Sequence, residues 1–434
     1  MKNPFISSCP FVLSAGLLLT GFTLLTPVRA GSLPDLVIPN TCGMQLKGDY
    51  STTSDLDQIK DVGVKMVRRG FHWEGIEKVK GAYDFTETDA IMQDIRQHGF
   101  RVLGVLAFGN KLYGPVYNTD DGREAYAKYA AALADRYKAD NVIWEIWNEP
   151  NTMTFWGKHG KNKGNSDDYA TEYVNLVKAT VPAMRQADPN CTIVAGSVSC
   201  LWSESYKWTE FCFEKGILQT GIDGWSIHPY SIKRPEDYPA AYDVVRDMMA
   251  KNGAARDFPI LDTERGFPIT KAEGYAGGDP AMVLQYQAWS LVRQFLADFT
   301  YGVHLTSWYE WKGKEFGIDK NNTLNPAGVA YKILIAQLNG CKFDKRLETQ
   351  SPLDFVMSFT GPGGEQKLVA WTTPPVNGGP DKAVPHSIDV PVTTTGSLDL
   401  VQIDGAKSSV TVNNGTITLA LTGAPQYITL QAGK

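Results

Sequence analysis

Residues 141–150 read NVIWEIWNEP, a stretch with the apolar character of a buried strand that nevertheless ends in an asparagine and a glutamate. Valine, isoleucine and tryptophan favour extended structure, so residues 142–147 are expected to form a strand. Burying Glu149 at the end of such a strand is costly unless its charge or its proton is needed. The stretch therefore predicts a strand whose carboxyl end carries a functional carboxylate.

Similar short apolar runs recur through the first three quarters of the chain, and amphipathic helical patterns separate them. The expected strands are residues 41–46, 65–69, 101–107, 142–147, 192–196, 224–228, 260–263 and 303–308. Strands that alternate with helices are typical of a parallel sheet with crossover helices. Eight of them in about 300 residues favour a closed (β/α)8 TIM barrel, so the expected fold class is α/β.

The composition changes after the segment NPAGVAYKILIAQLNG, which ends at residue 340. From about residue 347 onward, alternating strand patterns such as DFVMSFT and KLVAWTT are separated by glycine, proline and asparagine turns. The expected domains are a catalytic barrel over residues 31–340 and a C-terminal all-β domain, a β-sandwich, over residues 341–434. A few residues before the first barrel strand are also expected to be able to add a strand to this β domain.

Residues 1–30 have the pattern of a secretory signal peptide. Lys2 precedes an apolar stretch, and the segment Val-Arg-Ala ending at Ala30 has the small residues of a cleavage site. The apolar stretch is shorter than the ~20 residues that span a bilayer. We therefore expect cleavage after Ala30, export to the periplasm or the medium, and no membrane span.

Composition argues against several classes of function. The chain has a net charge of −5, 21% charged residues and no basic run, which disfavours nucleic acid or an anionic membrane as a partner. Five of the six cysteines follow Ala30, with Cys200 and Cys212 the nearest plausible disulfide pair. No CxxC motif is present and the six histidines are scattered, so neither a metal nor a cofactor is expected. Oligomeric state stays open.

The carboxyl ends of barrel strands converge on one mouth, where reactive residues of such barrels lie. Glu149 ends the fourth expected strand and Glu264 ends the seventh. Hydrolysis of a glycosidic bond requires two carboxyl groups, one to donate a proton and one ionised. The alternative is that each glutamate only pairs with a neighbouring arginine. For a retaining pair, the two carboxyl groups are expected to lie about 5–5.5 Å apart.

The segments IWEIWNEPN and PILDTERGFP resemble clan A of the glycoside hydrolases, which are retaining enzymes on (β/α)8 barrels. The resemblance implies that Glu149 is the acid/base and Glu264 the nucleophile. Asn148 would bind the 2-hydroxyl of the sugar, and Arg68 would keep the nucleophile ionised. His228 and Tyr230 also match positions of the clan, and the Tyr230 hydroxyl would lie near the nucleophile. Trp308 matches an aromatic platform for the sugar.

Residues 73–110 are similar to the second and third βα units of family 39-like and cellulase-like (family 5-like) members, which include secreted exopolysaccharide hydrolases. Arg265, beside the expected nucleophile, departs from the pattern of many relatives. It is expected to point outward into a salt bridge of the barrel wall. Glu310, two residues beyond Trp308, is a candidate third acid of the site.

These observations predict a secreted retaining β-glycoside hydrolase that acts on a polysaccharide or oligosaccharide. Endo-action is favoured if the aromatic residues expected near the mouth line an open groove. They are Trp73, Tyr113, Tyr117, Trp156, Trp202, Trp208, Trp308 and Trp311. Two alternatives remain: transglycosylation at the same site, and a non-catalytic carbohydrate-binding barrel.

Overall fold

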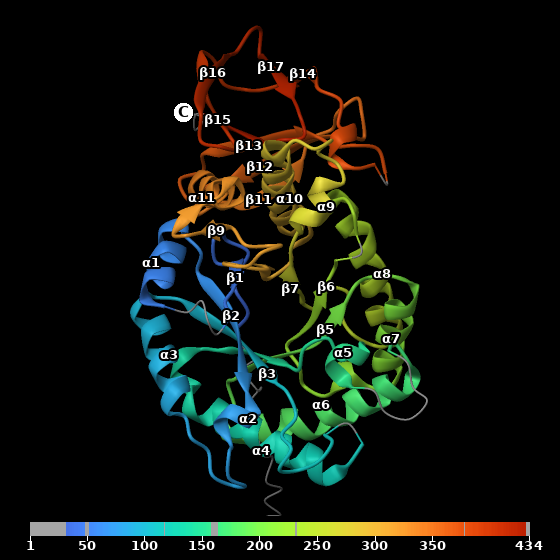
Figure 1. The fold of residues 1–434 in the computed structure, drawn as a ribbon. Helices are drawn as coiled ribbons and strands as arrows, with labels where there is room; N and C mark the ends of the chain where they lie inside the picture. Colours follow the sequence, from blue (N-terminus) through green and yellow to red (C-terminus); the bar gives the residue numbers. More distant parts are fainter. Residues whose placement is uncertain are drawn as a thin grey trace, which may run out of the picture.

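A computed structural model describes residues 32–47, 52–116, 118–157, 164–230, 232–376 and 378–430. The expected signal peptide, residues 1–30, lies outside these described residues. Figure 1 shows a ring of strands surrounded by helices, with a second body of strands at the top of the view. No helix in the described ranges combines the length and the apolar character needed to cross a membrane.

The first body is a closed parallel barrel in which neighbouring strands follow the order of the chain. Its last strand pairs with its first, Gly43 lying opposite Ser307. The strands are β1 (Cys42–Gln45), β2 (Met66–His72), β3 (Arg101–Ala107), β4 (Ile143–Ile146), β5 (Thr192–Ser199), β6 (Gly224–His228), β7 (Ile260–Arg265) and β8 (Thr306–Trp308). The predicted TIM barrel is therefore confirmed.

Helices cover the outside of the barrel (Figure 1). They are α1 (Thr53–Val62), α2 (Trp73–Ile76), α3 (Thr86–Gln97), α4 (Asp120–Arg136), α5 (Met153–Trp156), α6 (Asp167–Ala187), α7 (Ser203–Glu214), α8 (Tyr238–Lys251), α9 (Ile269–Glu273), α10 (Pro280–Tyr301) and α11 (Pro326–Leu338). Short 3-10 turns are η2 (Lys138–Asp140), η3 (Ile217–Gln219), η4 (Pro235–Asp237) and η5 (Pro380–Lys382). A small hairpin, β9 (Asp319–Lys320) and β10 (Thr323–Leu324), precedes α11.

The inside of the barrel is apolar at one level and polar at the next. Six buried side chains form a separate apolar cluster: Met66, Leu103, Ile143, Val194, Leu261 and Leu305. Because side chains two residues apart in a strand point to the same side, Arg68 and Glu145 lie one layer above Met66 and Ile143. The apolar layer thus closes the barrel beneath a buried charged layer, on which the functional residues rest.

The second body is an all-β domain. Its six-stranded sheet has the order β11-β12-β13-β18-β15-β16, and a two-stranded sheet of β14 and β17 accompanies it. The strands are β11 (Lys342–Arg346), β12 (Asp354–Thr360), β13 (Gln366–Thr372), β14 (His386–Pro391), β15 (Ser397–Gln402), β16 (Lys407–Thr411), β17 (Thr416–Leu421) and β18 (Gln426–Leu430). A core that includes Val356, Leu419 and Ile428 packs between the sheets, as in a β-sandwich.

Two expectations are wrong. Residues 32–41 add no strand to the β domain; instead the Ile38 amide donates to the Cys341 carbonyl and the Gly340 amide donates to the Ile38 carbonyl. The proposed disulfide between Cys200 and Cys212 is absent, since the described cysteines are all free thiols. Cys212 is buried in α7, whereas Cys200 lies partly exposed at the end of β5. The apolar face of α7 therefore explains Cys212 as a core residue.

A buried carboxyl pair links β7 to α10. Asp262 and Asp298 are both fully buried and close enough for the charge of Asp298 to act on Asp262, while neither oxygen of Asp262 has a hydrogen-bond partner among the described residues. Tyr242 and Thr306 donate to the two oxygens of Asp298, each at 2.8 Å. Burial raises the pKa of Asp262 and of Asp298, and their mutual repulsion raises the pKa of Asp262 further.

This pair predicts a loss of stability as the pH rises. The folded pair keeps a proton that an unfolded aspartate releases above about pH 4, so the unfolded state is favoured at higher pH. We expect the free energy of unfolding, from urea titrations, to fall by up to about 1.4 kcal/mol per pH unit above that point. Asp298→Asn should flatten this decline; an unchanged slope in Asp298→Asn would show that these buried carboxyl groups do not retain a proton.

Candidate active site

Glu149 lies in a tight turn after β4. Trp147 and Glu149 have left-handed backbone conformations, with φ of 68° and 47°, which side chains other than glycine adopt only at an energetic cost. The amide and the hydroxyl of Thr152 both donate to the Glu149 carbonyl at 3.0 Å. These bonds hold the turn, so the Glu149 carboxyl is presented at the mouth of the barrel.

A β-bulge in β5 supports this turn. The register between β5 and β6 shifts between Ala195 and Val198, and Gly196 and Ser197 have φ of 117° and 48°. A Cβ at Gly196 would lie 2.5 Å from the Ser226 carbonyl, so the bulge requires glycine there. The bulge brings the Ser197 hydroxyl within 3.3 Å of the Glu149 amide, which donates to it.

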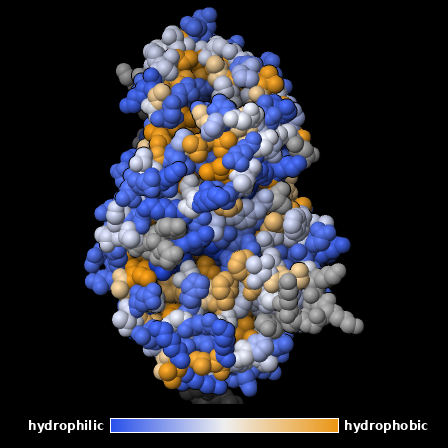
Figure 2. Space-filling view, in the orientation of Figure 1, coloured by the Kyte–Doolittle hydropathy of each residue, from blue (hydrophilic) through white to orange (hydrophobic). Residues whose placement is uncertain are grey.

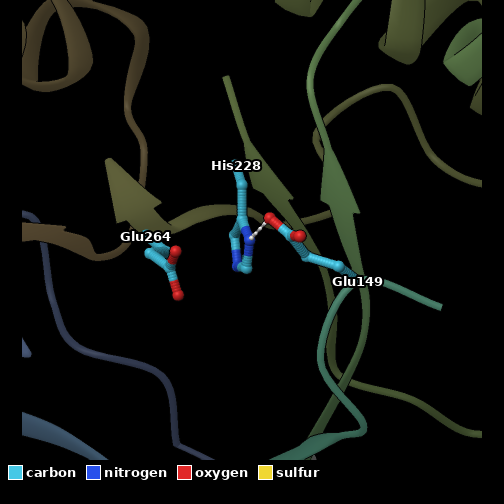
Figure 3. A group of neighbouring side chains, drawn as sticks. All are labelled: Glu149, His228 and Glu264. Atoms are coloured by element: carbon cyan, nitrogen blue, oxygen red, sulfur yellow. Dashed lines mark hydrogen bonds and ion pairs between the residues drawn. The ribbon is translucent and has the colours of Figure 1, made fainter. Parts of the chain in front are cut away.

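His228, the last residue of β6, lies between the two glutamates (Figure 3). Its Nδ1 is 3.0 Å from Glu149 Oε1. Its Nε2 lies 3.1 Å from the Ser197 hydroxyl and 3.2 Å from the Thr263 hydroxyl. The imidazole is fully buried, and contacts on both nitrogens hold its ring in one orientation beside the Glu149 carboxyl.

Glu264 is bound by two donors, one in β2 and one in the segment that follows β6. Arg68 Nη1 donates to Glu264 Oε2 at 2.6 Å, and the Tyr230 hydroxyl donates to Glu264 Oε1 at 3.1 Å. The β7–β8 register also shifts between Asp262 and Arg265, so the strand is irregular where Glu264 emerges. Both carboxylate oxygens of Glu264 therefore have a partner that stabilises the anion.

The Arg68 guanidinium is the centre of the buried charged layer. Its Nε and Nη2 donate to Glu145 Oε2 at 3.0 and 2.8 Å, and Nη1 also donates to Gln45 Oε1 at 2.7 Å. Nη2 further donates to Asn148 Oδ1 at 2.8 Å, which orients the amide so that its N–H donors point away from Arg68. Glu145 and Gln45 thus fix the cation that contacts Glu264, although sequence reasoning did not single them out.

Charge and hydrogen bonding decide the protonation state of the Glu264 carboxyl group. Burial alone would raise the pKa of Glu264, but the charges of His228 and Arg68 and hydrogen bonds from Tyr230 and Arg68 outweigh it. The pKa of Glu264 is therefore lowered. Burial and the charge of Glu264 raise the pKa of Tyr230, so its hydroxyl keeps the proton that it donates.

The separation of the two carboxyl groups fits a retaining pair. A carboxylate oxygen of Glu149, one of Glu264 and a ring nitrogen of His228 all lie within 4.8 Å of one another. Retaining glycosidases hold their carboxyl groups about 5–5.5 Å apart, whereas inverting enzymes need about 6.5–9.5 Å to admit a water. The approach of the nearest oxygens therefore favours the retaining arrangement.

The position of Trp308 does not fit an aromatic platform. Its side chain is 0% exposed and its indole N–H donates to the Phe316 carbonyl at 3.1 Å, so neither ring face is open to a sugar. Sequence position at the end of β8 does not reveal which side of the strand the ring takes. Tyr309, the next residue, is instead close enough to Glu264 for its pKa to be raised by burial and by that charge.

Most of the other aromatic residues expected at the mouth are also core residues. The buried members of the set are Trp73, Trp156, Trp208 and Trp311. Trp202, which follows β5, is 50% exposed, and Tyr113 is partly exposed. Tyr117 lies outside the described residues. A continuous row of stacking platforms is therefore not formed by the described members of this set.

Two further residues near the nucleophile have partners that the sequence did not suggest. Arg265 was expected to form a salt bridge of the barrel wall, but it is buried and donates to the Tyr238 hydroxyl and to the carbonyls of Gly266 and Ile232. Glu310 is buried and lies 2.7 Å from Lys47 Nζ. Burial raises the pKa of Glu310, Lys47 opposes this, and the charge of Glu264 adds to it.

Glu149, His228 and Glu264 are close enough together to hold a metal ion, but their partners argue against that use. Arg68 places a positive charge 2.6 Å from Glu264, which opposes binding of a cation. We therefore expect dialysis against a chelator to leave turnover unchanged, measured before and after adding Mg²⁺, Ca²⁺ or Zn²⁺. Loss of activity on chelation, with recovery on adding one ion, would contradict this prediction.

Comparison with known proteins finds similarity to glycoside hydrolases. Residues 35–243 match the family described as Cellulase (glycosyl hydrolase family 5). A β-xylosidase of Geobacillus stearothermophilus is 28% identical over 118 residues, which are 26% of this chain and 21% of that protein. A β-galactosidase of an Arthrobacter species is 21% identical over 366 residues, which are 65% of this chain and 51% of that protein. The chain thus spans about half or less of these curated relatives.

Among solved structures, a family 39 glycoside hydrolase from the gut symbiont Bacteroides cellulosilyticus WH2 has the same fold. Its TM-score is 0.70 at 22% identity, and the match covers 92% of this chain and 81% of that chain. The family model covers residues 35–243, slightly less than half of the chain, and the whole chain shares the fold of this family 39 glycoside hydrolase. Residues 35–243 are therefore similar to the cellulase family.

Proposed function

We propose that this protein is a retaining β-glycoside hydrolase that works by double displacement, with Glu264 as the nucleophile and Glu149 as the acid/base. The observation that carries the proposal is the unequal surroundings of two carboxyl groups that each have an oxygen within 4.8 Å of the other. Glu264 has two anion-stabilising donors, Arg68 and Tyr230. Glu149 instead faces the His228 imidazole, a group that can accept or donate a proton.

In the first step the ionised Glu264 attacks the anomeric carbon of the sugar. The bond from that carbon to the glycosidic oxygen breaks as Glu149 transfers its proton to the leaving oxygen. A glycosyl ester of Glu264 results, and Glu149 is left as a carboxylate. The negative charge of Glu264 is consumed, while Arg68 stays beside the ester and remains paired with Glu145.

In the second step Glu149 acts as a base. It takes a proton from a water molecule, whose oxygen attacks the anomeric carbon and displaces Glu264. Two inversions give a product with the configuration of the substrate, and both glutamates return to their starting states. This cycle explains the glutamate at the end of a buried strand: its proton is donated in one step and restored in the next.

The substrate belongs to this proposal as well. The related proteins are named β-xylosidase, β-galactosidase and cellulase, so a β-linked polysaccharide or oligosaccharide is the substrate class we propose. The signal-like pattern of residues 1–30 supports secretion to the periplasm or the medium. Endo-action is also proposed, with Trp202, which follows β5 and is 50% exposed, as a candidate contact for an extended chain.

Transglycosylation is the second candidate reaction, because a sugar hydroxyl can replace water in the second step with the same residues. A non-catalytic carbohydrate-binding barrel is disfavoured, since both glutamates and the donors to Glu264 are in place.

A panel of defined β-linked oligosaccharides tests the function. Mass spectrometry of the products separates hydrolysis from transfer, and their lengths separate internal from terminal cleavage. NMR spectroscopy of the first-formed anomer reports retention or inversion. Retention with cleavage of at least one β-linked substrate is expected, and an inverted first product would overturn the proposed mechanism.

A further inference from the structure

The segment between β6 and α8 reaches from the active site to the β domain. At one end Tyr230 donates to Glu264. At the other end Arg234 Nη1 donates to the Thr373 hydroxyl at 3.2 Å and to the Pro374 carbonyl at 2.9 Å. Thr373 and Pro374 follow β13, so the β domain holds the far end of the segment that begins at the nucleophile.

Glu236, part of a buried ion pair, makes a second contact between this segment and the β domain. Glu236 in η4 accepts from Arg293 of α10 through two bonds of 2.6 and 2.7 Å, and from the Trp371 indole N–H of β13 at 2.9 Å. The side chains of Arg293 and Glu236 are 4% and 1% exposed. A buried ion pair adds little folding free energy over an apolar contact, but its hydrogen bonds form only in one relative position of the two side chains. The contact between the domains is therefore specific as well as close.

Arg265 contacts both this segment and Tyr230. Its Nη2 donates to the Ile232 carbonyl at 3.0 Å, and its guanidinium lies over the Tyr230 ring, 5.5 Å from the centroid. Arg265 follows Glu264 directly in β7. The position of Ile232, set by the tie at Arg234 and Glu236, thus bears on the guanidinium that packs on Tyr230.

The aromatic residues of the β domain do not suggest a glycan-binding surface. Its aromatic side chains are Phe343, Phe355, Phe359, Trp371 and Tyr427, and all but the partly buried Phe343 are buried. Trp371 is stacked on Phe355 and directs its N–H toward Glu236. The ring that faces the barrel is therefore used for contact between the domains.

We propose that the β domain positions Tyr230 at the nucleophile, with Arg234 and Glu236 as the positioning residues that connect the two. The inference rests on the proposed function, in which Glu264 is the nucleophile. Without the tie, the Tyr230 hydroxyl would be free to leave Glu264, which would lose one of the bonds that stabilise its anion. The β domain would then be part of the catalytic unit rather than an accessory module.

The charged and titratable groups that face Glu264 must be considered in a test. They come from several strand ends: Arg68, Glu149, His228, Tyr230, Asp262, Tyr309 and Glu310. Of these, Tyr230 is the group whose segment is tied to the β domain through Arg234 and Glu236. A change at Arg234 that alters the titration of Glu264 therefore reports on Tyr230.

The test measures the pKa of Glu264 directly, by NMR titration of ¹³C-labelled glutamate carboxyls, and needs no substrate. The Glu264 signal is identified by its loss in Glu264→Gln. Tyr230→Phe is expected to raise the pKa of Glu264, because the anion loses a donor. Arg234→Met, which removes the bonds to Thr373 and Pro374, is expected to raise it in the same direction by a smaller amount. In the Tyr230→Phe background, Arg234→Met should cause no further rise.

Arg185→Met is the matched control. Arg185 in α6 is likewise held by several hydrogen bonds, but away from the site. It donates to the carbonyls of Cys191 and Gly221 and to the carboxylate of Asp223. It should leave the Glu264 titration unchanged. In turnover assays Arg234→Met should lower kcat by about tenfold with little change in KM, as expected for misplacement at the reacting centre.

An unchanged Glu264 titration in folded Arg234→Met, or an additive effect with Tyr230→Phe, would overturn the inference. Thr373→Val, which changes only the β-domain side of the tie, serves if Arg234→Met does not fold, and its Glu264 titration is judged by the same criteria. Failure of the proposed function would be seen separately, as absence of cleavage by the wild-type protein on the oligosaccharide panel.

Discussion

Glu264→Ala is expected to lower kcat by at least about 10⁴-fold, on natural polysaccharides and on activated aryl glycosides alike. A good leaving group cannot compensate, because the variant has no group to attack the anomeric carbon. The fold should persist, since Arg68 keeps Glu145 as a buried counter-ion. Circular dichroism and thermal unfolding check the fold, and steady-state kinetics on both substrate types measure the loss.

Azide gives this prediction a stereochemical readout. In Glu264→Ala the cavity left by the carboxylate admits azide on the face that the nucleophile used, and one inversion of a β-glycoside yields an α-glycosyl azide. Glu273→Ala, which changes an exposed glutamate of α9, is the control and should keep wild-type turnover without an azide product. A β-glycosyl azide from Glu264→Ala would mean that Glu264 is not the nucleophile.

The barrel was predictable because its strands are short apolar runs bounded by helical patterns. Residues 101–107 and 224–228 were expected as strands and are β3 and β6. β5 runs to Ser199, three residues beyond its expected end, because the strand continues through the bulge at Gly196 and Ser197. Such a bulge depends on contacts with β6, which a single strand's pattern does not contain.

In the β domain the strands with long apolar patterns were the ones expected. DFVMSFT is β12, whereas KFDKR, which is β11, carries four charged residues. β11 is a strand because it pairs with β12, Lys342 lying opposite Thr360. It is an edge strand of the sheet, where charged side chains are common. Pairing with a neighbour thus overrides a weak local preference.

At the site, the position of a residue along a strand was easier to predict than the direction in which its side chain points. Glu149 and Glu264 were expected at strand ends on opposite sides of the barrel mouth, and the structure brings an oxygen of each within 4.8 Å of the other. Trp308 was expected to face the sugar, but its ring packs in the core against the segment that contains Phe316. Glu145 was missed, although its alternation with Ile143 in β4 places it inside the barrel, in the same layer as Arg68.

Glu149→Ala should behave differently from Glu264→Ala, because the acid/base matters most when the leaving group is poor. We expect kcat on a natural polysaccharide to fall by about 10²–10⁴-fold, the usual contribution of a general acid. An activated aryl glycoside that the subsites accept departs without a proton, so the first step should continue. The second step lacks its base, and the glycosyl ester of Glu264 should accumulate, visible as a mass increase of the intact protein.

Added azide should release this ester, because an anionic nucleophile needs no base. Attack on the α-linked ester gives a β-glycosyl azide, the opposite anomer from that of Glu264→Ala. His228, whose Nδ1 lies 3.0 Å from Glu149 Oε1, would keep its contacts with Ser197 and Thr263, so the cavity left by Glu149 should remain shaped to admit the ion. Full activity of Glu149→Ala on polysaccharide, or an α-glycosyl azide from it, would show that Glu149 is not the acid/base.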